Sequence, residues 1–109
     1  MNVRRVFYIA AIFLVGIPAY AVSSTETCSA VGETAKSVMD ARQKNTDMSK
    51  LMEIMDRTGD GDEGTQEFYR KIVILAYKRP AWHTQKLRDE AVAQFSNDIQ
   101  LACFQNAEK

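Results

Sequence analysis

The sequence has little of what catalytic centres are usually built from. Its 109 residues include a single histidine, His83, and only two cysteines. It contains no nucleophile elbow, zinc-ligand spacing, phosphate-binding loop or dinucleotide fingerprint. A pairing of His83 with a distant serine or cysteine stays open, because such partners meet only in the fold. Since His83 closely follows Pro80, we expect it in an exposed turn between helices, and we predict a protein that is not an enzyme.

An excess of charge of one sign is also lacking. Lysine and arginine together number 14, and aspartate and glutamate together also number 14. Proteins that bind nucleic acid or an anionic membrane surface need a concentrated excess of cationic side chains. We therefore expect neither class of partner.

What the sequence does have is the pattern of a secretory signal peptide over residues 1–21. Two arginines precede the apolar run Val6–Ile17, and a small-x-small cleavage site follows it at Ala19–Ala21. As a helix this run would rise about 18 Å, against a bilayer core of about 30 Å, so it is too short for a membrane anchor. We predict cleavage and a periplasmic or secreted product without a stable membrane anchor. Residues 22–109 then form one small domain.

The two cysteines lie near the two ends of that domain. In an oxidising compartment Cys28 and Cys103 are expected to form a disulfide. Closing so long a loop would restrict the unfolded chain by about 4 kcal/mol in the entropy model. The alternative is a redox site, but catalytic cysteine pairs are usually close in sequence, as in C-x-x-C. The spacing therefore favours a structural bond.

Hydrophobic periodicity predicts four helices and no strand, so the fold class is all-α. The first helix begins at a capping box, Ser23 to Glu26, and ends near Asn45. The second covers Met48–Arg57 with Asp47 as its cap, the third begins at Thr65 and ends before Pro80, and the fourth follows Thr84. The expected inward positions are Cys28, Val31, Ala35, Val38 and Met39 in the first helix; Met48, Leu51, Met52 and Met55 in the second; Phe68, Ile72, Val73, Leu75, Ala76 and Tyr77 in the third; and Leu87, Ala91, Phe95, Ile99 and Cys103 in the fourth.

This pattern predicts a small helical bundle of three to four helices tied by one disulfide. A bond between Cys28 and Cys103 would make the first and fourth helices antiparallel neighbours. The wide apolar surface of the third helix predicts that it is the most buried of the four.

An acidic segment between the second and third helices resembles the twelve-residue calcium loop of an EF-hand. It runs from Asp56 to Glu67, with Gly61 at the sixth position, where the loop turns sharply. The resemblance implies calcium as a cofactor, held by the side chains of Asp56, Thr58, Asp60 and Glu67 and by the backbone carbonyl of Asp62.

This acidic segment also departs from the EF-hand pattern. The eighth position, normally aliphatic, is Glu63, the third is threonine rather than aspartate or asparagine, and no second loop is present to pair with it. The alternative is a solvated acidic turn in which Gly59, Gly61 and Gly64 supply backbone freedom.

A second candidate site lies around Pro80. Tyr77, Arg79 and Trp82 place two aromatic rings and a cation beside a rigid proline. Such side chains supply large contacts at low entropic cost, which predicts a partner-binding corner. In the alternative, Trp82 folds back onto the bundle and Arg79 favours the negative end of the third helix.

A series of short motifs runs from the first cysteine to the last. It consists of Cys28, Ala41-Arg42-Gln43, a short methionine-rich helix, Ala76-Tyr77, Pro80, Phe95 and Cys103. In this order the chain resembles a group of small exported proteins of bacteria and their phages to which no activity is assigned. The resemblance implies a disulfide-tied helical domain and supplies no catalytic residues.

Together these features predict a small exported helical protein that acts by binding. Its partner would be an envelope or extracellular protein, with this chain as an inhibitor or accessory factor. The first alternative is a calcium-binding module with a single EF-hand-like loop. The second is a small periplasmic chaperone, a role to which the apolar helices and the small size of the chain are suited.

Overall fold

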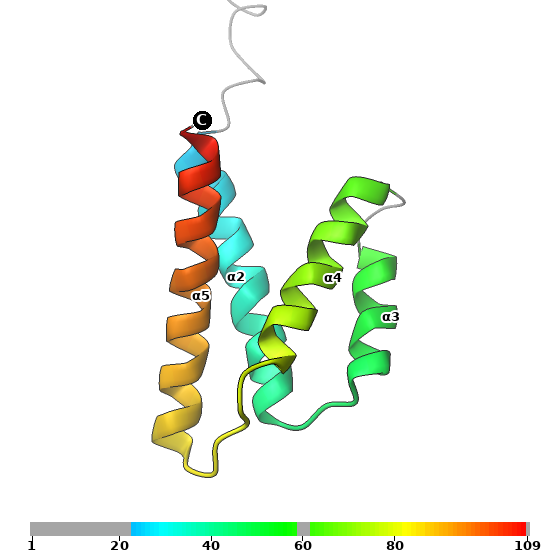
Figure 1. Ribbon diagram of the computed structural model, residues 1–109, viewed down its shortest axis with the longest axis vertical. Helices are drawn as coiled ribbons and strands as arrows, with labels where there is room; N and C mark the ends of the chain where they lie inside the picture. Colours follow the sequence, from blue (N-terminus) through cyan, green and yellow to red (C-terminus); the bar gives the residue numbers. More distant parts are fainter. Residues whose placement is uncertain (1–22, 59–61, 109) are drawn as a thin grey trace, which may run out of the picture.

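The computed structural model describes residues 23–58 and 62–108, and the predicted signal peptide lies outside them. Four helices make up almost all of this part of the chain: α2 (Ser24–Gln43), α3 (Met48–Thr58), α4 (Glu63–Tyr77) and α5 (Gln85–Ala107). The described residues contain no strand, so the all-α prediction is confirmed. The α2/α5 pair and the α3/α4 pair diverge toward the end that carries the C-terminus (Figure 1).

The α2/α5 pair is antiparallel and closely packed, as predicted from the cysteines. The disulfide joins Cys28 to Cys103 with 5.6 Å between their Cα atoms. One turn further along, the Ser96 hydroxyl donates to the carbonyl of Gly32 at 2.9 Å. A Cβ atom on Gly32 would lie 2.5 Å from Nε2 of Gln100, so a larger residue here would displace the Gln100 side chain.

The central helix is α2, because it packs against α3, α4 and α5. It buries six residues, whereas α4 buries only Ile72, Val73 and Ala76. The prediction that the third helix is the most buried was therefore wrong, because α4 packs against α2 and α3 but leaves large apolar side chains such as Phe68 and Leu75 exposed. The buried core consists of Ala35, Val38, Met39, Leu51, Met55, Ile72, Val73, Ala76, Phe95 and Ile99.

Three residues predicted to face inward are exposed instead. Phe68 and Leu75 of α4 are 40% and 43% exposed, and Leu87 of α5 is 39% exposed. Leu87 lies in the first turn of α5, at the edge of the bundle. Phe68 lies in the first half of α4, which leans away from the α2/α5 pair (Figure 1), whereas Leu75 lies near the C-terminal end of the helix.

The helix starts are set by side-chain caps, three of which were predicted at the right residue. Ser23, Asp47 and Thr84 accept from backbone N–H groups three residues on. For the third helix the prediction of Thr65 was wrong, because Asp62 caps α4 and accepts from both the backbone N–H and the hydroxyl of Thr65. These bonds lower the pKa of Asp62. Aspartate is a stronger N-cap residue than threonine. Here Asp62 is the cap and Thr65 donates hydrogen bonds to it.

None of the helices in residues 23–58 and 62–108 has both the length and the apolarity that spanning a membrane requires.

The disulfide should supply a large part of the stability of this domain. Its cysteines are 75 positions apart, so the double variant Cys28→Ala, Cys103→Ala should lose about 4 kcal/mol of unfolding free energy. Urea unfolding followed by circular dichroism measures the loss. Dithiothreitol should destabilise the wild type similarly and leave the double variant unchanged. Equal stabilities of the two proteins would contradict this account.

Candidate partner-binding site

The connection between α4 and α5 is held against the end of α2 by two neighbouring side chains. Arg42 donates from Nε to the carbonyl oxygen of Arg79 at 2.9 Å. Gln43 is buried although polar, and its amide bonds the loop in both directions. Its Nε2 donates to the carbonyl of Pro80 at 2.9 Å, and its Oε1 accepts from the N–H of Trp82 at 2.8 Å. The loop backbone is therefore fixed at three points.

Two of the residues predicted for a partner-binding corner make contacts inside the bundle. The Tyr77 hydroxyl donates to the carbonyl of Thr46 at 2.6 Å, and partial burial raises the pKa of this phenol, so it stays protonated as a donor. Arg79 lies over the Phe95 ring, 4.8 Å from its centroid, and pairs with Asp98 at 2.8 Å. Tyr77 thus ties the end of α4 to the connection between α2 and α3, and Arg79 ties the α4–α5 loop to α5.

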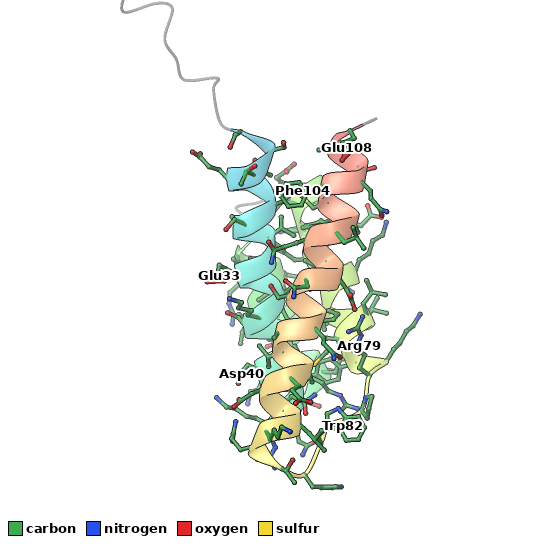
Figure 2. All side chains as sticks on the ribbon, turned by 90° about the vertical axis from the view of Figure 1, so that its left-hand side faces the viewer. Glu33, Asp40, Arg79, Trp82, Phe104 and Glu108 are labelled. Carbon is green, nitrogen blue, oxygen red and sulfur yellow. A yellow bond between two sulfur atoms is a disulfide. The ribbon has the colours of Figure 1, made fainter. Side chains whose placement is uncertain are left out.

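Trp82, the third of these residues, projects from the fixed loop and is 41% exposed. Its carbonyl accepts from Nε of Arg88 at 3.0 Å, so its backbone is bonded on both sides. Figure 2 shows Trp82 with Arg79 at the end of the bundle far from Glu108. The structure thus presents a partly exposed aromatic side chain on a backbone that is held by hydrogen bonds. Its role in partner binding stays a prediction.

Two of the predicted calcium ligands take part in ion pairs. Both carboxylate oxygens of Asp56 accept from Nη1 of Arg70, at 3.1 and 3.0 Å, which joins α3 to α4. Glu67 pairs with Lys71 at 3.7 Å, one turn along α4. A calcium ion on Asp56 would therefore compete with a guanidinium for the same oxygens.

The other calcium candidates lie at the helix ends or outside the described residues. Thr58 donates its hydroxyl to the carbonyl of Ile54 at 2.7 Å in the last turn of α3. Asp62 is the α4 cap, and Asp60 lies outside the described residues. Across residues 23–58 and 62–108, no cluster of three histidine, cysteine, aspartate or glutamate side chains is placed to hold a metal. The calcium site stays a prediction.

The first of two surface hollows lies between α2 and α4, where the helix pairs diverge. This hollow, groove A, has a volume of about 630 Å³. Its walls are mostly apolar or carry only hydroxyl groups, and its charged residues are Glu26 and Asp62. The other wall residues that matter here are Ala30, Val31 and Thr34 of α2 and Thr65, Phe68 and Tyr69 of α4.

The second hollow, groove B, lies on the other side of α4, between α4 and α5. It has a volume of about 540 Å³, and Lys71 is the charged residue in its wall. The apolar wall residues are Phe68, Ile72 and Leu75 of α4 and Ile99, Ala102, Cys103 and Ala107 of α5. The disulfide thus forms part of groove B.

Phe68 belongs to both grooves. The second half of α4 packs into the core through Ile72, Val73 and Ala76, but its first half stands away from α2 and α5. The residues opposite Phe68, such as Ala30 and Ala102, are too small to fill the space. A large aromatic ring is therefore left at the centre of an open, mostly apolar wedge.

Comparisons with protein-family models, curated proteins and solved structures found no match. The function must therefore be inferred from this geometry.

Sequence reasoning identified Phe68 but placed it in the core, and it missed both grooves. A usable signal was present in the small residues at three-residue and four-residue steps in α2, such as Thr27, Ala30 and Thr34. Together with residues of α4 they line groove A. Sequence reasoning also missed Gln43, since the pattern does not show which polar residue the Pro80 loop will cover.

Replacing Gln43 should free the loop that carries Trp82. In Gln43→Leu the Pro80 carbonyl and the Trp82 N–H lose their partner, which should cost about 2 to 3 kcal/mol of unfolding free energy. Because Trp82 is the only tryptophan, its fluorescence reports on the loop, and acrylamide should quench it more strongly. Gln94→Leu, on the exposed side of α5, is the control. Unchanged quenching in Gln43→Leu would contradict the proposed anchoring.

Calcium should leave the stability of the domain unchanged. Asp56 already pairs with Arg70, and Asp62 and Glu67 have protein partners. We expect the same Tm with a chelator and with about 10 mM calcium, well above the Kd of extracellular calcium modules. Differential scanning calorimetry of the wild type and of Glu67→Ala gives the test. A rise in Tm that disappears in Glu67→Ala would instead support the calcium-binding hypothesis.

Proposed function

We propose that this chain is a periplasmic or secreted binding protein that holds an apolar segment of a partner protein in the wedge around Phe68. In this role it acts as an inhibitor or accessory factor for an envelope or extracellular protein. Export is supported by the Cys28–Cys103 bond, because disulfides form and persist mainly in oxidising compartments.

The observation that carries this proposal is the placement of Phe68 between the two grooves. Its side chain is 40% exposed, although it lies next to buried Ile72 on the same helix. Hollows between helices, lined by apolar side chains, are common sites of recognition. Exposed aromatic residues beside such hollows often dominate the binding energy of an interface.

Both walls of the wedge are held in place by bonds between helices. The α2/α5 wall is braced by the disulfide and by the Ser96–Gly32 hydrogen bond. The opposite wall, α4, is braced from outside by α3 through the Asp56–Arg70 ion pair and by the bond from Gln66 Nε2 to the Asp56 carbonyl at 2.7 Å. A partner would therefore meet a largely preformed surface, which lowers the entropic cost of binding.

Site-specific photo-crosslinking tests the proposal. A photoreactive phenylalanine analogue at position 68 should give one discrete adduct with an envelope or secreted protein of the source cells. The control is the same analogue at Ile74, which is 41% exposed on the same helix but lines neither groove. Mass spectrometry identifies the adduct.

Equal adducts at both positions, or none at Phe68, would overturn the proposal. Many unrelated adducts at position 68 would also contradict a specific partner and would favour the chaperone hypothesis.

A further inference from the structure

The charge around groove A is acidic in the described part of the molecule. Its two charged wall residues, Glu26 and Asp62, are both anionic. No lysine or arginine of the described residues lines the groove, and the cations Lys36, Arg70 and Lys71 pair with Glu33, Asp56 and Glu67. Among the ion pairs of the described residues, neither Glu26 nor Asp62 has a cationic partner.

The negative charge of Asp62 is held in place by its local bonds. Its carboxylate accepts from the backbone N–H of Thr65 at 3.2 Å and from the hydroxyl of the same residue. These hydrogen bonds favour the ionised form and lower the pKa of Asp62, so the group stays anionic near neutral pH.

The walls of the groove decide which backbone conformation an occupant can have. Both walls are helices, whose own backbone groups are bonded along the helix axis. An extended peptide would therefore find no sheet edge along either wall to satisfy its N–H and C=O groups. A helix satisfies these groups internally and needs only an apolar face to bind in such a groove.

The length of the groove limits the contact. Its α2 wall extends from Glu26 to Thr34 and its α4 wall from Asp62 to Tyr69, which is about 12 Å, or two to three helical turns. The small side chains of Ala30 and Thr65 allow a helix to approach closely.

We infer that groove A binds an amphipathic helix whose apolar face covers Phe68 and whose flanking residues are cationic and lie beside Glu26 and Asp62. This inference rests on the proposed function and adds the chemical class of the partner. Shape and apolar area supply the affinity, whereas the two carboxylates select the charge of the occupant.

Binding of model peptides tests the inference. The probes are two fluorescein-labelled 14-residue amphipathic helices, one of leucine and lysine and one of leucine and glutamate, and a leucine–lysine peptide of scrambled order. Fluorescence anisotropy measures their Kd for the mature protein. We expect the amphipathic leucine–lysine peptide to bind about tenfold more tightly than either of the others.

Variants locate the binding. Phe68→Ala should raise the Kd of the leucine–lysine peptide about tenfold or more, as truncation of a central aromatic contact does. Glu26→Gln should raise the Kd of this peptide about threefold and make the Kd less dependent on salt concentration. The controls are Ile74→Ala and Glu53→Gln, which are exposed and line neither groove. Circular dichroism verifies that each variant is folded.

The outcomes separate this inference from the proposed function. Equal affinity for the two amphipathic peptides, or binding that Glu53→Gln weakens as much as Glu26→Gln, would overturn the selection of cationic helices. If neither peptide binds but crosslinking at position 68 yields a discrete partner, the inference fails and the proposed function stands. If both experiments fail, both proposals are wrong.

Discussion

The close pairing of α2 with α5 is the contact on which the other helices depend. Along the pair, the Ser96 hydroxyl bonds the carbonyl of Gly32, and the Gln100 side chain lies where a Cβ atom of residue 32 would be. At one end the disulfide joins the helices, and at the other Gln43 holds the loop that leads into α5. The pair therefore forms a firm wall, and α3 and α4 pack against its α2 side. A glycine inside a helix costs stability by itself, but here it leaves room for the Gln100 side chain of the neighbouring helix.

The wedge arises because α4 has a core-forming half and a surface-forming half. Its second half buries Ile72, Val73 and Ala76 against α2 and is followed by the loop that Arg42 and Gln43 hold. Its first half is connected to α3 instead. A helix fixed to one neighbour at its end and to another at its start must cross the space between them, which leaves hollows on both sides. The arrangement thus places the open wedge beside the buried core.

Much of the fold could be predicted from local patterns. The helix ranges follow from apolar spacing, the caps at Ser23, Asp47 and Thr84 from residue type, and the antiparallel α2/α5 pair from two cysteines at opposite ends of the domain. These signals depend on neighbours in the sequence or on a covalent bond.

The errors concern relations between helices that are distant in the sequence. Apolar spacing shows that Phe68 and Ile72 share a face, but not that the partner helices reach only Ile72. The same reason explains why α2 rather than α4 is the most buried helix. In the candidate sites, Arg79 is a residue type that is common in binding surfaces, yet it stacks on Phe95. No local sequence pattern reveals this contact. The acidic connection resembles a metal loop in composition, whereas Asp56 bonds an arginine fourteen positions further on.

The disulfide also has a consequence for the order in which the domain can be assembled. Among the described helices α2 comes first in the sequence, and α5, which carries the second cysteine, comes after α3 and α4. No shorter N-terminal fragment can be closed covalently, because Cys28 has its only intramolecular partner 75 positions later. The covalent ring of this bundle can consequently close only when α5 is present.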